Sequence, residues 1–328
     1  MSLDKVAIVH NKLSENPTID EIDVMSQVNV IQKALIELGY ETEILPFSFE
    51  INSFISNLKK INPKFIFNLV ESIENDGQLI CIAPAIFDSL KIPYAGCTKE
   101  AIFLTSNKVI TKKIMASYGI KTAEWVTIDD DEDNVFIEGA RYIIKAVWED
   151  ASICLEEDSV VSPTSIEDLR RLIKERNIKH NIEFFAERYI HGRDLSTPVL
   201  AGKPLSTREV VFVGYTGDRV KVVGYKAKWE EETEEFKTSE MTFNFAPEDR
   251  ELLDRVGILA KKCWDKFNLN GYARVDFRVD DNGDIYVLEI NANSCLSPDS
   301  AFYDAIEIAG MTFTDAVKLI VEDMKYIY

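Results

Sequence analysis

One stretch of the sequence, residues 271–291, constrains the fold more than any other. Two runs of alternating apolar residues flank the dipeptide Asn282-Gly283. This dipeptide is the strongest short signal for a β-hairpin, because both central residues of a tight turn adopt a positive φ. We therefore predict two antiparallel strands joined by a two-residue turn, with Val279 opposite Tyr286.

The predicted turn also sets the register of the polar residues. Asp276 is expected opposite Glu289, and Arg274 opposite Asn291, with all four side chains on one face of the hairpin. The other face is expected to carry Val275, Phe277, Leu288 and Ile290. Two opposed carboxylates repel each other and destabilise a sheet, so a divalent cation between them would relieve the repulsion.

The ligand types indicate which cation would bind. Carboxylate and amide oxygens on a rigid scaffold suit Mg²⁺ rather than zinc. The chain has only three histidines, which argues against a zinc site and against a histidine-based nucleophile. The pattern alone leaves a second interpretation open, in which the charged face of the hairpin simply meets water.

Lysines are the next candidates, because Mg²⁺ without a dedicated protein cage usually accompanies phosphate. Lys145 stands in an otherwise apolar strand, where it needs an anionic partner unless the strand lies at a sheet edge. Lys228 ends another predicted strand. Lys108 has Lys112 and Lys113 close by, so on its own it is typical of a solvated helix face. The two commonest glycine-rich phosphate loops are absent from the sequence.

Length, charge and cysteine content bound the class of protein. A chain of 328 residues predicts two or three domains. A formal net charge of -19 argues against an extended contact with nucleic acid or an anionic membrane. We find no apolar run long enough to cross a bilayer and no leader, and the odd number of cysteines, five, favours a reducing cytoplasm.

The order of predicted elements indicates an α/β fold, with an α+β arrangement towards the C-terminus. Residues 1–98 alternate strands and helices, which predicts a parallel sheet covered by helices. A long helix is expected at 99–118. The remaining predicted elements are strands at 141–147, 183–190, 195–200, 209–213 and 220–228, helices at 162–177 and 247–266, and two C-terminal helices.

Taken together, these segments resemble the ATP-grasp superfamily and, within it, the D-alanine–D-alanine ligase-like branch. The resemblance covers nearly the whole chain in order, and its most specific motifs are ARVDFR and LEINANS. RYIIKAVWEDAS, AERYIHGRDLS and GYKAKWEEETEEF resemble the family's phosphate loop, adenine hinge and lid. The resemblance implies a Rossmann-like N-terminal domain at 1–98, a central ATP-grasp subdomain at 99–186 and a catalytic subdomain at 187–328.

The resemblance also implies roles for individual residues. ATP would be held by Lys108, Lys145, Ser152, Glu187, Arg188, Tyr189, Ile190, Asp194 and Lys228. Within that set, residues 187–190 would surround adenine, Asp194 would bind the ribose, and Lys228 would reach the γ-phosphate. Arg274 and Lys228 would act in catalysis, and the metal ligands would be Asp276, Glu289 and Asn291.

The implied reaction joins a small-molecule carboxylate to an amine. ATP would phosphorylate the carboxylate, and the amine would then displace phosphate, with two Mg²⁺ ions, or Mn²⁺ in their place, neutralising charge. Neither nucleic acid nor a membrane is an expected partner. The sequence leaves open whether the chain forms a homodimer.

The acceptor side departs from the family pattern. The residues that position the first substrate in the family, Glu, Ser and Tyr, correspond here to Asp23, Ala151 and Trp229. In the family a Pro-Gly pair follows the metal-binding asparagine, and in this chain Ser294-Cys295 takes its place. For Cys295 we favour a role in packing over a role as a nucleophile.

Further departures lie in the glycine-rich and histidine-containing segments. The usual phosphate-loop glycine is Cys154, and residues 68–71 replace a His-Gly pair. Ser300 is the candidate for holding the carboxylate of the second substrate. The ATP half of the pattern is thus retained while the acceptor half differs, which favours a ligase for other amino acids. Authentic D-alanine–D-alanine ligation, nucleotide binding without turnover and a phosphotransferase are the alternatives.

Overall fold

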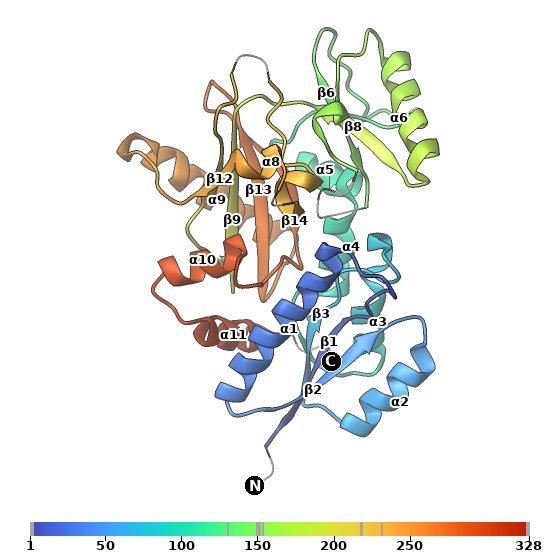
Figure 1. The fold of residues 1–328 in the computed structure, drawn as a ribbon, viewed down its shortest axis with the longest axis vertical. Helices are drawn as coiled ribbons and strands as arrows, with labels where there is room; N and C mark the ends of the chain where they lie inside the picture. Colours follow the sequence, from blue (N-terminus) through green and yellow to red (C-terminus); the bar gives the residue numbers. More distant parts are fainter. Residues whose placement is uncertain are drawn as a thin grey trace.

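Three β-sheets make up the framework of the computed structural model, which describes residues 3–129, 131–148, 152, 154–216, 219–230 and 232–325. In Figure 1 the N-terminal sheet lies at the bottom, the sheet containing β6 and β8 at the upper right, and the sheet containing β9, β13 and β14 at the upper left. No helix in these ranges is long and apolar enough to span a membrane.

The N-terminal sheet is parallel, as the alternation of strands and helices predicts. Its strand order is β2-β1-β3-β4. The strands are β1 (Lys5–Asn11), β2 (Glu41–Phe47), β3 (Phe65–Leu69) and β4 (Tyr94–Ala95). Helix α1 (Ile19–Glu37) packs on one face, and α2 (Ile51–Ile61) and α3 (Ile82–Ser89) pack on the other. A short 3₁₀ helix, η1 (Gly77–Leu79), precedes α3.

The predicted helix at 99–118 is wrong as a single element. The segment forms two helices, α4 (Lys99–Ser106) and α5 (Lys108–Ser117), separated by Asn107 in an extended conformation. The side chain of Asn107 caps α5 by accepting a hydrogen bond from the backbone of Ile110 at 2.8 Å. The backbone N–H of Lys108 donates to the carbonyl of Val147 at 3.0 Å, so the break joins α5 to the end of a neighbouring strand.

The central sheet is antiparallel, in the order β5-β8-β6-β7. Its strands are β5 (Trp125–Val126), β6 (Tyr142–Ala146), β7 (Val160–Val161) and β8 (Phe184–Arg188). Helix α6 (Ile166–His180) covers one face and is capped by Ser165, and η2 (Glu157–Ser159) precedes β7. The predicted domain boundary after residue 186 falls inside β8, so we propose to place it after Arg188 instead.

The C-terminal sheet carries the predicted hairpin. Its strand order is β12-β11-β9-β13-β14, with β10 paired to β9. The strands are β9 (Arg193–Leu200), β10 (Lys203–Pro204), β11 (Arg208–Phe212), β12 (Ser239–Thr242), β13 (Tyr272–Val279) and β14 (Ile285–Asn291). Helix α9 (Arg250–Lys266), preceded by η3 (Pro247–Asp249), packs against the apolar face and leaves the polar face to the site.

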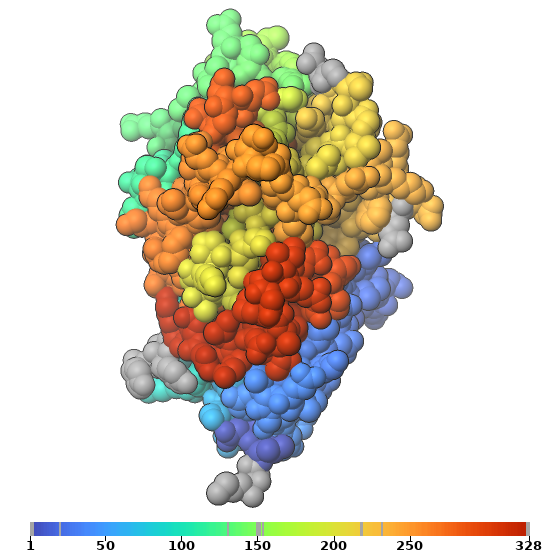
Figure 2. All heavy atoms as spheres, turned by 90° about the vertical axis from the view of Figure 1, so that its left-hand side faces the viewer, coloured from blue at the N-terminus to red at the C-terminus, as the bar shows by residue number. Residues whose placement is uncertain are grey.

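The last two helices connect the C-terminal part of the chain to the N-terminal sheet. They are α10 (Ala301–Ile308) and α11 (Phe313–Glu322). Apolar residues of α11 share a buried cluster with Val24, Val28 and Ile31 of α1. Figure 2 shows these helices, in red, directly against the blue N-terminal part.

The hairpin register is confirmed at the polar residues and wrong near the turn. Asp276 lies opposite Glu289, and Arg274 lies opposite Asn291. Val279, however, pairs with Ile285 rather than Tyr286, because the turn spans residues 280–284: Asp280 exchanges backbone hydrogen bonds with Gly283 and Asp284.

A β-bulge compensates for the longer turn. The register shifts at Leu288, which has no partner on β13, and Val287 takes the core position that was predicted for Leu288. Thr122 meets the strand at this point, where its hydroxyl donates to the carbonyl of Val287 at 2.8 Å.

The strand predicted at 220–228 is also wrong. Residues 220–224 are irregular, and Tyr225–Trp229 forms a short helix, α7, followed by α8 (Glu234–Lys237). Lys228 therefore lies on a helix that precedes an acidic turn. Alternating apolar residues at 220–224 favoured a strand, yet no neighbouring strand pairs with them in the described part of the chain.

Candidate functional site

The polar face of the hairpin forms a compact group of charged and amide side chains. Arg274 donates two hydrogen bonds to Asp276, from Nε to Oδ1 at 2.8 Å and from Nη2 to Oδ2 at 2.9 Å. The Nδ2 atom of Asn291 donates to Asp276 at 2.9 Å and to Glu289 at 3.5 Å. The four predicted residues therefore form one hydrogen-bonded row across β13 and β14.

Cations from other elements surround the Glu289 end of this row. The Nζ atom of Lys108, at the start of α5, lies 3.8 Å from Oε2 of Glu289. Burial opposes the charge of Glu289, but Lys108, Lys228, Lys145 and Arg274 outweigh it and lower the pKa of this carboxyl well below its usual range. Burial raises the pKa of Asp276, and Arg274 counters that effect.

The donor set fits a magnesium ion. Asp276, Glu289 and Asn291 can supply two carboxylates and an amide oxygen, all hard donors, and the Nδ2 atom of Asn291 already contacts both carboxylates. No histidine or cysteine belongs to the group. These residues could hold Mg²⁺ if Arg274 shares the oxygens of Asp276 with the ion.

A second group of charges is buried between α5 and the central sheet. Glu187 of β8 forms ion pairs with Lys112 and Lys145, each with an N···O distance of 2.5 Å. Although burial disfavours the charge, the two lysines lower the pKa of Glu187 to about 2. The anionic partner that was expected for Lys145 is therefore Glu187, and β6 is an inner strand rather than a sheet edge.

Lys112 is the member of this group that the sequence did not single out. Its ammonium forms an ion pair with Oε2 of Glu187 and donates hydrogen bonds to Oγ1 of Thr122 at 2.7 Å and to the carbonyl of Ala123 at 3.2 Å. The buried residues of α5 are Lys108, Thr111, Lys112 and Met115. Their spacing is that of one helix face, so periodicity could have identified both lysines as buried.

The residues predicted to surround adenine lie in different surroundings and do not all line one space. Arg188 pairs with Glu124 at 2.5 Å, and its guanidinium lies 5.3 Å from the ring centre of Tyr286. Ile190 is buried in the small cluster that contains Tyr286. Tyr189 is buried beside Ile143 and Val222, and its hydroxyl accepts a hydrogen bond from the backbone of Lys221 at 2.8 Å.

Asp194, the predicted ribose ligand, is engaged by an arginine of the hairpin. Its Oδ2 atom lies 3.0 Å from Nη2 of Arg278, which is the residue directly opposite it in the sheet. Arg278 also donates to the carbonyl of Lys221 at 3.2 Å. The segment 220–224 is thereby tied to the polar face of the sheet.

The predicted phosphate loop and lid touch each other. The hydroxyl of Ser152 donates to the carbonyl of Val223 at 2.9 Å, and the backbone of Tyr225 donates to the carbonyl of Leu155 at 3.1 Å. Gly224 is required for this approach, because a Cβ there would lie 2.5 Å from the carbonyl oxygen of Leu155. Ala151, the departure from the family serine, lies outside the described residues.

Asp23 lies beside the loop that follows β14 and forms no hydrogen bond or ion pair with the described residues of the hairpin row. The thiol of Cys295 donates to Oδ2 of Asp23 at 3.0 Å and lies 2.8 Å from the hydroxyl of Ser297. Burial raises the pKa of the Cys295 thiol well above its usual value, which argues against a nucleophile. Burial also raises the pKa of Asp23.

Ser300 caps helix α10. Its hydroxyl accepts a hydrogen bond from the backbone of Tyr303 at 3.2 Å. The structure thus gives this residue a clear structural role, and any contact with a substrate would come in addition to it.

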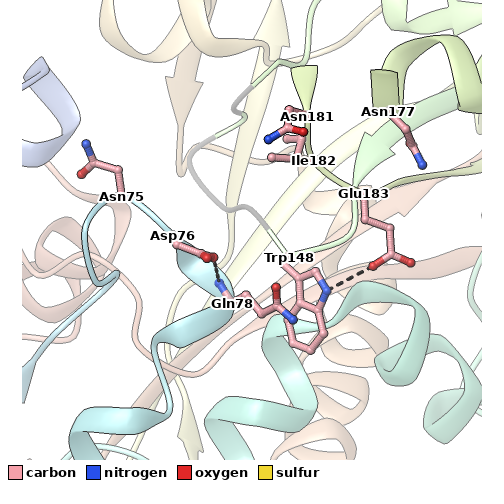
Figure 3. Close-up of a pocket in the computed structure, with 8 residues that line it drawn as sticks. All are labelled: Asn75, Asp76, Gln78, Trp148, Asn177, Asn181, Ile182 and Glu183. Atoms are coloured by element: carbon pink, nitrogen blue, oxygen red, sulfur yellow. Dashed lines mark hydrogen bonds between the residues drawn. The ribbon is translucent and has the colours of Figure 1, made fainter. Parts of the chain in front are cut away.

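A pocket of about 510 Å³ lies outside the hairpin row. Figure 3 shows Asn75, Asp76 and Gln78 on one side of it and the indole of Trp148 hydrogen-bonded to Glu183 on another. The remaining lining residues are Asn177, Asn181 and Ile182. None of these side chains belongs to the predicted site. The pocket nevertheless lies near the end of β6, because Trp148 is only two residues beyond that strand.

Comparison with known proteins gives a consistent family assignment. The family model described as D-ala D-ala ligase C-terminus matches residues 114–322. The D-alanine–D-alanine ligase of Rickettsia canadensis is 26% identical over 305 residues, covering 92% of this chain and 79% of that protein. The enzyme of that name from Aquifex aeolicus is 25% identical over 293 residues, covering 89% of this chain and 92% of that protein.

Solved structures of the same class share the fold. The D-alanine–D-alanine ligase of Bacillus anthracis, in complex with ATP, aligns with a TM-score of 0.73 at 20% identity, over 98% of this chain and 97% of that one. The structure from Coxiella burnetii aligns with a TM-score of 0.70 at 16% identity, over 98% and 93% of the two chains.

Proposed function

Since the chain belongs to the D-alanine–D-alanine ligase C-terminus family, whose model covers residues 114–322, we propose that it joins a small carboxylate to an amine at the expense of ATP. The predicted ATP-grasp fold is confirmed by the solved structures. The observation that carries the proposal is the row of Arg274, Asp276, Glu289 and Asn291, with Lys108 beside it.

In the proposed reaction, an oxygen of the substrate carboxylate attacks the γ-phosphorus of ATP. The bond between that phosphorus and the bridging oxygen breaks, and ADP leaves. The amine nitrogen then attacks the acyl carbon, a C–N bond forms, the C–O bond to phosphate breaks, and the amine loses a proton. Positioned charges suffice for both steps, so no covalent intermediate with the protein is needed.

The residues of the chain divide this work. Lys108, Lys145 and Lys228 approach the row from α5, β6 and α7, and they would bind the phosphates. Arg274, held by its two bonds to Asp276, would stabilise the negative charge that develops on the acyl oxygen.

Magnesium would be held by Asp276, Glu289 and Asn291, where two ions, or Mn²⁺ in their place, would neutralise the charge of the phosphates. Glu187 would hold Lys145 in position for the nucleotide, and Asp194 would exchange part of its contact with Arg278 for the ribose.

The residues on the acceptor side of the site favour a ligase whose substrates are not two D-alanines. The loop after β14 reaches Asp23 through the half-buried thiol of Cys295, and Leu296 donates its backbone N–H to Gln27 at 3.0 Å. These contacts involve the segment in which the sequence departs from the family's Pro-Gly pair. We therefore propose a ligase for other amino acids or a related carboxylate and amine, with authentic D-alanine–D-alanine ligation as the alternative.

Phosphate release tests this proposal. Wild-type protein is supplied with Mg-ATP and pairs of amino acids, including D-alanine with itself, and the product mass is determined. We expect ADP, phosphate and an amide-bonded product with at least one pair that lacks D-alanine. Efficient turnover with D-alanine alone would contradict the preferred assignment, and a stable phosphorylated product without an amide would indicate a phosphotransferase.

Replacing Lys145 by alanine is expected to weaken ATP binding. The ammonium would lose a charge-assisted hydrogen bond to phosphate, a contact worth roughly 1.5–3 kcal/mol, or about 10- to 100-fold in affinity. Titration calorimetry with ATP measures the change. Glu187 keeps Lys112 as a partner in the variant, so the fold is expected to persist.

Lys113→Ala is the matched control for Lys145→Ala, because Lys113 is a partly exposed lysine that pairs with Asp131. ATP affinity is expected to stay within about twofold of wild type in this variant. Equal affinities for Lys145→Ala and wild type would mean that Lys145 serves only as a partner of Glu187.

A further inference from the structure

Arg208 is a cation on the polar face of the C-terminal sheet that neither the family motifs nor the proposed mechanism uses. It lies on β11 opposite Ser196 of β9, and Ser196 lies opposite Asp276 of β13. Residues directly opposite each other in an antiparallel sheet point to the same face. Arg208 therefore extends the row of Asp276 and Glu289 across the sheet to β11.

The side chain of Arg208 has no partner among the residues that the structure describes. Its Nε atom is buried without a hydrogen bond, and the side chain forms no ion pair. Burial, followed by repulsion from Arg274, lowers the pKa of Arg208 to about 10, so the guanidinium is still charged at neutral pH.

The nearby carboxylates are already engaged by other residues. Both oxygens of Asp276 accept hydrogen bonds from Arg274, and Asp194 is paired with Arg278. A third carboxylate, Asp304 of α10, acts on Arg208 only from beyond ion-pair distance. Arg208 is half-buried, and a partly desolvated charge without a counter-ion is costly in a folded protein. A side chain kept in this state is therefore expected to meet an anion that the chain itself does not supply.

The position of Arg208 separates it from the phosphate-binding lysines. Lys108 contacts Glu289 on β14, whereas Arg208 lies three strands away on β11. At about 4.8 Å per strand, the backbones of Arg208 and Glu289 are roughly 14 Å apart. The planar fork of an arginine matches a carboxylate, and the lysines already provide for the triphosphate.

We propose that Arg208 binds a carboxylate of the amine substrate and thereby selects acceptors with a free carboxylate over acceptors in which that carboxylate is blocked as an amide. This inference rests on the proposed ligase function, because it assigns the anion to the second substrate. It also accounts for the missing partner of the guanidinium: the substrate carboxylate neutralises the charge, and Arg274 stays bound to Asp276 beside the reacting acyl group.

Two variants test the proposal by binding, with no need for turnover. Wild type, Arg208→Met and Arg208→Lys are titrated by calorimetry with D-alanine, D-glutamate and their C-terminal amides, in the presence of Mg-ADP. Wild type is expected to bind at least one acid about tenfold or more tightly than its amide, as for a charge-assisted bond. Arg208→Met is expected to lose this preference, and Arg208→Lys to keep part of it.

Thermal unfolding separates a binding role from a structural one. Because Arg208 has no partner, Arg208→Met is expected to raise Tm. Arg193→Met is the matched control: Arg193 pairs with Glu209 and Asp249, so its loss is expected to lower Tm. A clear drop in the Tm of Arg208→Met would show that the guanidinium supports the fold and would overturn the proposal.

The remaining outcomes are equally decisive. An acid preference that survives in Arg208→Met, or its absence in wild type, would overturn the proposal. A fall in ATP affinity in Arg208→Met, with acceptor binding unchanged, would assign Arg208 to phosphate instead. A protein that shows the acid preference but releases no phosphate with any acceptor would refute the ligase function while leaving the carboxylate site in place.

Discussion

Replacing Glu289 by glutamine is expected to abolish ATP turnover, lowering kcat by at least about 100-fold, comparable to the loss of one preorganised electrostatic contact in an active site. The glutamine keeps the shape of the side chain but removes the negative charge that attracts Lys108, Lys228 and Lys145. It also removes one of the two carboxylates proposed to bind Mg²⁺. ADP formation, measured across a magnesium titration, reports the effect.

The fold is expected to tolerate the Glu289→Gln change. Asp276 remains neutralised by Arg274, and the Glu289 side chain is one-quarter exposed, so water can solvate Lys108 in the variant. Asp284→Asn is the matched control, because Asp284 belongs to the same hairpin but pairs with Lys121 at its exposed end. Wild-type kcat in Glu289→Gln, at any magnesium concentration, would mean that this carboxylate is not part of the active site.

Replacing Glu187 by glutamine is expected to produce the largest loss of stability. The change leaves Lys112 and Lys145 without their shared counter-ion, and breaking a buried ion pair costs roughly 3–5 kcal/mol. Chemical denaturation measures the free energy of unfolding. Glu183→Gln, an exposed position one residue before β8, is the control and is expected to change stability little.

The contribution of Glu187 should also depend on pH. Its pKa falls from an ordinary value of 4.5 to about 2 in the folded protein, which corresponds to about 3 kcal/mol. Because the folded pKa is the lower one, the unfolded chain binds the proton first as pH falls. The stabilisation is therefore complete above about pH 5 and is lost progressively from there to about pH 2.

Unfolding curves of wild type and Glu187→Gln between pH 7 and pH 3 test this dependence. The difference between the two proteins is expected to shrink as pH falls. A difference that stays constant over this range would show that Glu187 acts through packing and not through its charge.

The hairpin illustrates how far local pattern determines structure. Alternation and the Asn-Gly turn signal predicted that Asp276 faces Glu289, and this is correct. The prediction nevertheless contained two errors that cancel, because the turn is longer than two residues and Leu288 forms a bulge. A one-residue slip would have turned the carboxylates towards α9, so burial of the apolar face restores the register after the turn.

The lysines illustrate the opposite case. The run of Lys108, Lys112 and Lys113 is typical of a solvated helix face, yet Lys108 and Lys112 are buried and Lys113 is partly exposed. The spacing of these residues can indicate which lysines face the interior, but it does not reveal their partners, which lie elsewhere in the chain. Glu187 is 75 residues from Lys112 and 42 from Lys145, and only the packing of α5 on β6 and β8 brings them together.

The sequence by itself determined the order of strands and helices, the faces of β13 and β14, and the set of residues that resembles an ATP site. The order of elements and the strand faces follow from periodicity and turn chemistry, which act between residues a few positions apart. The residues of the ATP site follow from the resemblance of their motifs to the ATP-grasp family. The tertiary structure alone decided which charges are neutralised: Glu187 by two lysines, Asp194 by Arg278, and Arg208 by no described residue. The reason is physical, because the partner of a buried charge depends on which elements pack together, and no local pattern encodes that distance.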